Sequence, residues 1–173
     1  MTAAGARWQS RALRSPLGPI AVFVSDGAVV RIRFCDAPNS GDDPLLDDAV
    51  RQLTRYFANE TTEFDLPLAP AGSGLQKQVW RRLTAIPYGE TITYGALAEA
   101  VGSGPRAVAN MCGRNPIPIV IPCHRVVGAG DWLGGFSGGA GVATKEDLLR
   151  LEGALPHTLF SRDAFDRFAG KSA

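Results

Sequence analysis

The chain has 173 residues, of which 45% are hydrophobic and 20% are charged, and its formal net charge is +1. This length suits one large domain or two small ones, and this composition excludes a disordered or fibrous protein. No apolar run is long enough to cross a bilayer, and the first residues lack the pattern of a signal peptide. We therefore expect a cytoplasmic protein with no membrane partner.

Charge is distributed unevenly along the chain. Residues 1–72 hold seven basic and nine acidic side chains, whereas residues 73–173 hold eleven basic and eight acidic ones. The basic excess of the second half fits contact with phosphate groups, but a solvated basic face gives the same pattern.

The first half predicts a hairpin followed by a helix. Residues 19–25 and 28–34 are strand-like, and Asp26-Gly27 between them is typical of a two-residue hairpin turn. In the second strand we expect Val30, Ile32 and Phe34 on one face. Apolar residues at helical spacing then predict a helix over residues 44–59, and residues 66–74 are expected to form a linker.

The second half begins with three predicted helices. The first covers residues 74–86, with an apolar face made of Leu75, Val79, Trp80, Leu83 and Ile86. Thr93 is placed to cap a short helix over residues 94–101, and Pro105 suits the first turn of a helix that runs to about residue 113. The turn between these two, residues 102–104, contains two glycines, which outlines a helix-turn-helix. Many helix pairs that bind no nucleic acid share this outline.

Prolines exclude a helix over residues 115–118, and the apolar run at 119–121 is expected to be extended or a buried strand. A glycine-rich loop follows over residues 128–141. The last long helix is predicted from Thr144 to Glu152, with Thr144 and Asp147 as a capping-box pair. A short helix is expected from Ser161, packed by Phe165 and Phe168.

The three cysteines, Cys35, Cys112 and Cys123, are too few and too scattered for a disulfide framework. With only two histidines, the chain has no ligand pair spaced for a metal, so we expect no metal site. Each cysteine is therefore either a small buried residue or a reactive thiol.

Cys123 has neighbours that suit a nucleophile. His124 is adjacent and can take the thiol proton directly or through water, and an inward carboxylate from Glu152 can hold the imidazole in the required tautomer. A dry site alone would raise the thiol pKa, so these partners are needed. The same residues also fit a buried cysteine beside a structural histidine, or a thiol hydrolase.

Three segments carry a more specific pattern: Arg106-Ala107-Val108, Asn115-Pro116 and the run from Ile119 to Val126. Further matches lie at residues 72–76, 79–80, 86–89, 93–94, 137–139 and 145–149. Together they resemble the O6-alkylguanine-DNA alkyltransferases, also called methylated-DNA–protein-cysteine methyltransferases. The resemblance implies an α/β (α+β) protein, with a ribonuclease-H-like domain over residues 1–72 and a mostly helical domain with a helix-turn-helix over residues 73–173.

The resemblance also implies a chemistry. Cys123 would attack the alkyl carbon on guanine O6 and keep the alkyl group, so that each molecule acts once, without metal or cofactor. His124 would be its base, acting through a water, and Glu152 would orient His124. Asn115 would order the turn before the active-site segment, and Tyr94 would hydrogen-bond guanine N3.

The implied partner is double-stranded DNA containing O6-alkylguanine, bound in the minor groove by a monomer that extrudes the damaged nucleotide. Such a protein would be bacterial and associated with the nucleoid. Arg106 would fill the space left by the extruded nucleotide, and the backbone of Val126 and Ser137 would read the base edge. The other implied substrate contacts are Phe136, Gly138 and Pro118, and the other implied DNA contacts are Tyr94, Ala107, Arg114 and Arg125.

Two residues depart from the family pattern. Phe136 lacks the hydroxyl of the aromatic residue common at its position, and Cys112, on the helix facing the DNA or the pocket, is expected to be a packing residue. A non-catalytic relative that only binds the lesion is the main rival function, and Cys123 distinguishes the two because such relatives lack the cysteine.

Overall fold

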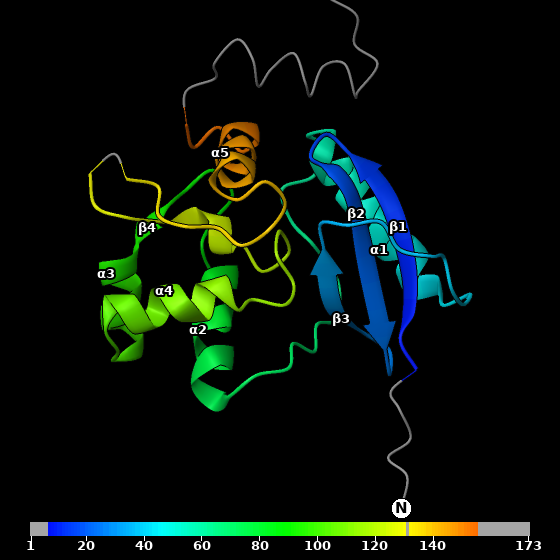
Figure 1. The fold of residues 1–173 in the computed structure, drawn as a ribbon, viewed down its shortest axis with the longest axis horizontal. Helices are drawn as coiled ribbons and strands as arrows, with labels where there is room; N and C mark the ends of the chain where they lie inside the picture. The colour runs from blue at the N-terminus through cyan, green and yellow to red at the C-terminus, as the bar shows by residue number, and fades with distance from the viewer. Residues whose placement is uncertain (1–6, 131, 156–173) are drawn as a thin grey trace, which may run out of the picture.

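The computed structural model describes residues 7–130 and 132–155 (Figure 1). A small sheet and one helix form an N-terminal lobe, and the remaining helices form a helical lobe beside it. This mixed architecture, an antiparallel sheet and, within the described residues, five α-helices, confirms the predicted fold class. No helix within the described residues is long and apolar enough to cross a membrane. The helix expected from Ser161 lies outside the described residues.

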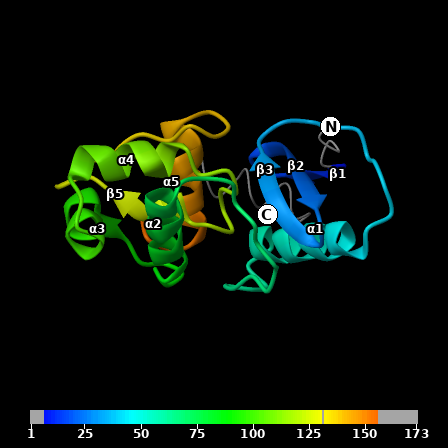
Figure 2. The ribbon, with the colours of Figure 1, turned by 90° about the horizontal axis from the view of Figure 1, so that it is seen from below.

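The N-terminal sheet has the order β1-β2-β3, and both strand pairs are antiparallel. Asp26 and Gly27 have φ values of 51° and 76°, the backbone that the tightest hairpin turns require, so the predicted hairpin is confirmed. Figure 2 shows α1 lying along one face of the sheet. The elements are β1 (Gln9–Ser15), β2 (Gly18–Ser25), β3 (Ala28–Arg33) and α1 (Pro44–Phe57).

A bulge in β3 overturns the expected alternation of its side chains. Val24 pairs with Val29 and Phe23 pairs with Arg31, so Val30 is the extra residue of the bulged strand. The bulge turns Val29, which is fully buried, toward the core in place of Val30. Ile32 stays on the buried face as predicted.

Helix α1 confirms the helix predicted in the first half. It begins where the Asp43 carboxylate accepts a hydrogen bond from the Leu45 amide at 2.9 Å, and Pro44 occupies the first turn. Its buried face packs on the sheet and consists of Leu46, Ala49, Leu53, Tyr56 and Phe57. Part of the expected linker joins the sheet as well, because the amide of Val29 donates to the Pro67 carbonyl and the Val29 carbonyl accepts from Ala69.

The helical lobe contains α2 (Gly74–Thr84), α3 (Tyr94–Val101), α4 (Pro105–Gly113) and α5 (Val142–Leu151), with the short parallel strands β4 (Ile92–Thr93) and β5 (Val126–Val127). Ser73 and Gln76 form a capping box at the start of α2. The apolar face predicted for this helix is confirmed except at Leu75, which is exposed.

Helices α3 and α4 form the predicted helix-turn-helix. The Thr93 hydroxyl accepts from the Ala96 amide at 3.1 Å, so Thr93 caps α3 as expected. Gly102 caps the C-terminal end of α3, and Pro105 is the first residue of α4. The two helices pack together through their buried residues, which are Leu97, Ala98 and Val101 on α3 and Val108 and Cys112 on α4.

The start of α5 differs from the prediction. The helix begins at Val142 after Gly141, and no side chain caps it, so the expected capping box of Thr144 and Asp147 is wrong. The Thr144 hydroxyl instead accepts a hydrogen bond from the Ala140 amide at 2.8 Å. This bond ties the glycine-rich loop to the first turn of α5.

Candidate active site

Cys123 begins a single 3₁₀ turn, Cys123–Arg125, that follows a tight turn rather than an extended run. Ile119 has a φ of 74°, which is strained for a β-branched residue, and the Ile121 amide donates back to the Ile117 carbonyl at 2.9 Å. The prediction that residues 119–121 are extended is therefore wrong, although all three are buried as expected.

Asn115 holds this turn together from inside. Its Nδ2 donates to the Ile121 carbonyl at 2.7 Å, and its Oδ1 accepts from the Ile117 amide at 3.0 Å. One side chain thus bonds to both arms of the turn that delivers Cys123. These are the contacts expected of a residue that orders the turn, and they offset the strain at Ile119.

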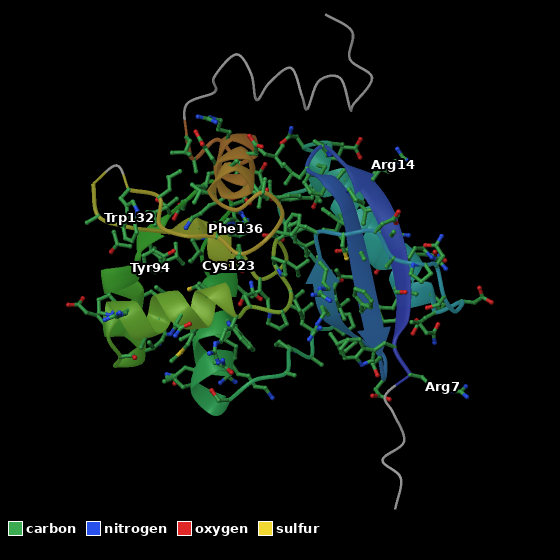
Figure 3. All side chains as sticks on the ribbon, viewed as in Figure 1. Arg7, Arg14, Tyr94, Cys123, Trp132 and Phe136 are labelled. Carbon is green, nitrogen blue, oxygen red and sulfur yellow. The ribbon has the colours of Figure 1, made fainter. Side chains whose placement is uncertain are left out.

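Two cavities meet at Cys123. The smaller, of about 340 Å³, lies beside α3 and α4 and is lined by Tyr94, Ala109, Cys112, Gly113, Cys123, Trp132, Gly135, Phe136 and Ser137. The larger, of about 620 Å³, opens toward β3 and is lined by Arg31, Ile32, Arg33, Phe34, Cys35, Arg114, Asn115, Pro116, Pro118, Cys123, Phe136, Ser137, Gly138 and Gly139. Figure 3 shows Tyr94, Cys123, Trp132 and Phe136 gathered between α4 and the loop over residues 128–141.

The Cys123 thiol is 7% exposed, and its burial raises its pKa above the ordinary value. A hydrogen bond from the Asn115 side chain and the positive charge of Lys145 act in the opposite direction and lower the pKa. The resting thiol is therefore protonated near neutral pH, and it needs a base to become a nucleophile.

His124 supplies that base. It is fully buried, and its Nε2 lies 2.7 Å from Oε1 of Glu152. Burial holds the pKa of His124 below its ordinary value, so the imidazole is neutral near pH 7. Because an ionised carboxylate only accepts hydrogen bonds, Nε2 carries the proton and Nδ1 carries the basic lone pair. Among the described residues Nδ1 has no protein partner, which leaves it available for the thiol proton.

The Glu152 carboxylate is the meeting point of four groups. Besides His124 it accepts two hydrogen bonds from Arg125, at 2.8 and 2.9 Å, and one from the Tyr56 hydroxyl at 2.7 Å. A longer bond of 3.4 Å comes from the Gly89 amide. Tyr56 belongs to α1, so the N-terminal lobe contributes directly to this centre, which sequence reasoning had missed.

Burial by itself would raise the pKa of Glu152, but the hydrogen bonds from His124 and Arg125 outweigh it and lower the pKa to about 2. The carboxylate is therefore ionised at every physiological pH. Its negative charge fixes both the tautomer and the direction of the imidazole.

The predicted contact of Arg125 with DNA is corrected by this arrangement. Arg125 is 6% exposed, its guanidinium is paired with Glu152, and its Nη1 donates to the Ile86 carbonyl at 2.6 Å. Because the Arg125 guanidinium is hydrogen-bonded to buried groups of the helical lobe, it is not available to a ligand at the surface. Sequence position beside the nucleophile did not reveal this.

A buried lysine supports Tyr94 on the other side of the cavity. Lys145, on α5, is fully buried, and its Nζ donates to the Val126 carbonyl at 2.6 Å, to the Tyr94 hydroxyl oxygen at 3.2 Å and to the Gly135 carbonyl at 3.3 Å. Because Lys145 donates to the Tyr94 oxygen, the Tyr94 proton is free to point elsewhere. Burial raises the pKa of Tyr94 to about 12, so the phenol keeps this proton.

The remaining predicted substrate contacts, except Val126, line a cavity that contains Cys123. Phe136 and Ser137 line both cavities, and Pro118 and Gly138 line the larger one. The Ser137 hydroxyl donates to the Gly113 carbonyl at 3.0 Å and so joins the loop to α4. Val126 is fully buried in β5, and its carbonyl is held by Lys145.

Cys112 lines the smaller cavity together with Cys123, which agrees with its expected place on the helix facing the pocket. Its thiol is 5% exposed, and burial raises its pKa to about 12. It is therefore an unreactive neutral thiol in the cavity wall. Within the described part of the chain, no cluster of three or more histidine, cysteine or acidic side chains is placed to hold a metal ion.

The predicted DNA contacts on α4 lie on its outer face. Arg106 and Ala107 are exposed, whereas Val108 and Cys112 face inward; Arg114, also exposed, follows α4 as its C-terminal cap and lines the larger cavity. Arg106 stands in the first turn of α4, at the same end as the Gly102–Gly104 turn. An exposed second helix of a helix-turn-helix with an arginine in its first turn is suited to contact with a nucleic acid.

Comparison with known proteins identifies relatives along nearly the whole described chain. Residues 10–70 match the family model described as 6-O-methylguanine DNA methyltransferase, ribonuclease-like domain, and residues 74–154 match the model for the DNA binding domain of the same family. A methylated-DNA–protein-cysteine methyltransferase of Methanosarcina acetivorans is 42% identical over 150 residues, covering 81% of this chain and 95% of the relative. One from Mycolicibacterium paratuberculosis is 43% identical over 151 residues, covering 82% and 90%.

Solved structures of related proteins also match this chain. The crystal structure of Mycobacterium tuberculosis OGT in complex with DNA matches with a TM-score of 0.74 and 39% identity, covering 83% of this chain and 92% of that one. The structure of the Mycobacterium tuberculosis O6-methylguanine methyltransferase matches with a TM-score of 0.76 and 37% identity, covering 88% and 98%.

Proposed function

Because the chain belongs to the 6-O-methylguanine DNA methyltransferase family, we propose that it repairs DNA by transferring the alkyl group of O6-alkylguanine to Cys123. The observation that carries the proposal is the buried chain of contacts behind this cysteine. Glu152 fixes the Nε2 side of His124, and the unpaired Nδ1 is left as the base for the thiol.

The transfer is an in-line displacement. His124 Nδ1 takes the Cys123 proton through a bridging water, and the thiolate sulfur forms a bond to the alkyl carbon as the bond from that carbon to O6 breaks. The electron pair of the broken bond stays on the guanine. The product is a thioether, which is not reversed by cellular reductants, so the protein is consumed by one reaction.

Tyr94 and Lys145 assist the departure of the guanine. The Tyr94 hydroxyl donates to guanine N3, and the Lys145 ammonium, 3.2 Å from the Tyr94 oxygen, stabilises negative charge that develops on it. The base occupies the smaller cavity, between α4 and the loop over residues 128–141. The alkyl group faces the larger cavity, where Pro118 and Gly138 lie.

Damaged DNA tests this function directly. The protein is incubated with a duplex bearing O6-methylguanine, and its peptides are mapped by mass. A single added methyl on Cys123 is the expected result. Tight binding with unmodified Cys123 would instead identify a lesion-binding protein without transfer, and repeated turnover on simple thioesters with no reaction on DNA would identify a thiol hydrolase.

Arg106→Ala is expected to slow repair of duplex DNA by about ten- to hundredfold, because the side chain that replaces the extruded nucleotide in the stack is lost. Reaction with free O6-benzylguanine needs no extrusion and is expected to change little. The two rates are compared under single-turnover conditions. Equal slowing of both reactions would contradict a role in extrusion.

The pH dependence of transfer should show the titration of Lys145. Burial lowers the pKa of Lys145 to about 8, although Cys123 and Cys112 would raise it when ionised. The rate of transfer is expected to rise with pH as the Cys123 thiol loses its proton. It should then decline above pH 8, because Lys145 loses the positive charge that favours the thiolate. A single-turnover pH profile is the measurement.

Lys145→Met is expected to lower the maximal rate and to abolish this decline at high pH. The folded state of the variant is checked by circular dichroism, because two carbonyls lose their donor. A decline that persists in Lys145→Met would assign it to another group.

Several finer features belong to the same proposal. We propose that the protein acts as a monomer in the minor groove, in the cytoplasm of a bacterium and at its nucleoid. The exposed side chain of Arg106, in the first turn of α4, supports the DNA contact. We also propose that residues 1–72 and 73–173 are its two domains, since the two family models meet near this boundary.

A further inference from the structure

Trp132 is the most exposed of the large hydrophobic residues in the described chain, with 66% of its surface open to solvent. It is also one of the residues that line the smaller cavity beside Cys123. Figure 3 shows it on the opposite side of the site from the sheet, close to Tyr94. An indole that is both exposed and part of a ligand cavity is a candidate contact for the ligand.

The ring is held in place by its own loop. The Gly128 amide donates to the Trp132 carbonyl at 2.8 Å, which closes the loop between them. The ring lies so close to Gly128 that a β-carbon there would come within 1.9 Å of a ring carbon, so a larger residue at this position would displace the ring. One face of the indole therefore lies against the loop, so little conformational entropy is lost when a ligand binds to the other face.

Tyr94 links this ring to the reacting centre. The centroids of the Trp132 and Tyr94 rings are 6.4 Å apart, and their planes are tilted by 46°. The Tyr94 ring also lies against the backbone of Gly134, where a β-carbon would be 2.6 Å from the phenol. Since Tyr94 is the proposed partner of guanine N3, Trp132 stands at the side of the cavity where the base enters.

A comparison with Trp8 shows that exposure alone does not explain Trp132. Trp8 is 45% exposed, but its ring packs edge-on against Phe23 at 6.1 Å and the Arg31 guanidinium lies 5.0 Å over it. These contacts account for Trp8 as part of the sheet surface. Trp132 combines greater exposure with a place in the cavity wall.

We propose that Trp132 stacks on the extruded alkylguanine nucleoside at the mouth of the smaller cavity and so selects extruded bases. This inference rests on the proposed function. A planar purine offers its π face to an indole whatever group it carries at O6, so the contribution should be the same for small and large alkyl groups. In undamaged DNA the bases stay paired and stacked, so they do not reach Trp132 and the contact adds nothing to the affinity.

The test compares the wild-type protein with Trp132→Ala, Trp132→Phe and, as a matched surface control, Trp8→Ala. Single-turnover rates are measured at limiting protein on duplexes bearing O6-methylguanine or O6-benzylguanine, and affinity is measured for an undamaged duplex. Trp132→Ala is expected to react about 5- to 100-fold more slowly with both lesions by the same factor. Affinity for undamaged DNA should stay unchanged, and Trp132→Phe should recover most of the rate.

Fluorescence provides a readout that a structural role would not move. Stacking on guanine quenches indole emission, so emission should fall on mixing with the lesion duplex in the wild type and in Trp8→Ala. The fall should be absent in Trp132→Phe, although that variant still reacts.

Three results would overturn the inference. Equal weakening on damaged and undamaged duplexes would make Trp132 a contact of the DNA backbone, and unequal loss on the two lesions would make it a contact of the alkyl group. An unchanged rate in Trp132→Ala, with normal methylation of Cys123 in the wild type, would remove Trp132 from the site and leave the proposed function intact. A wild-type protein that acquires no methyl group would instead contradict the proposed function.

Discussion

Cys123→Ser is expected to reduce alkyl transfer to the level of a protein-free control while leaving lesion binding in place. A serine hydroxyl is far less acidic than a thiol, and neutral His124 is too weak a base to make it a nucleophile in this buried site. Cys123 is 7% exposed and lies outside α4, so the exposed surface proposed to meet DNA is unchanged. Transfer of a labelled methyl group and binding to a lesion duplex are measured on the same preparation.

Cys35→Ser serves as the matched control. Cys35 is a free, partly buried cysteine at the far wall of the larger cavity, so its replacement should leave the transfer rate near that of the wild type. Label that persists in Cys123→Ser and disappears in Cys35→Ser would show that the wrong cysteine has been assigned.

Glu152→Gln is expected to lower both the stability of the fold and the rate of transfer. The substitution leaves the buried Arg125 charge without its partner, and breaking a buried pair in this way typically costs about 3–5 kcal/mol. The rate should fall because the amide no longer fixes the His124 tautomer. Urea unfolding and single-turnover kinetics measure the two effects separately.

The pH dependence of stability gives the sign of the Glu152 contribution. In the folded protein the pKa of Glu152 is lowered to about 2 from the ordinary value of 4.5, so the folded state favours the ionised form. This stabilisation is fully present above pH 4.5 and is lost as the pH falls toward 2. The difference in free energy of unfolding between wild type and Glu152→Gln should therefore shrink over that range.

Glu146→Gln is the control for loss of an acidic side chain. Glu146 pairs with Arg150 one turn along α5, and its side chain is 35% exposed, so the loss should be at most about 1 kcal/mol. Equal destabilisation by the two substitutions would contradict a special role for the buried carboxylate.

Local chemistry made part of the fold predictable. Asp26-Gly27 specifies a hairpin turn, Thr93 specifies the start of α3, and Pro105 specifies the first turn of α4. In each case a few adjacent residues determine the backbone, so no tertiary contact is needed to predict it. The same holds for the inward carboxylate at Glu152, which stands out at the end of an apolar helix.

Elements that depend on distant partners were not predicted. β1 buries Ser15 beside Leu13 on one face, and Ser10 on the other face bonds to Pro38 and Ser40, so neither face shows the apolar alternation that marks a strand. The turn at Ile119 has the same apolar sequence as a buried strand, and the side-chain bonds of Asn115 decide between the two. The bulge at Val30 likewise follows from pairing with β2.

The buried charges of the site were the largest omission. A lysine in a helix sequence is normally assigned to the surface, and nothing local marks Lys145 as the donor to three oxygens around the cavity. The family resemblance implied that Arg125 contacts DNA, whereas its guanidinium is paired with Glu152, 27 residues away. Spatial proximity of this kind becomes visible only in the folded chain.

The central claim is that Cys123 is consumed rather than regenerated. Its most direct test is the number of methyl groups transferred per protein molecule in the presence of excess labelled O6-methylguanine duplex. Transfer is expected to stop at one methyl per molecule, all of it on Cys123. Continued turnover beyond one equivalent, or saturation of binding with no label on Cys123, would contradict it.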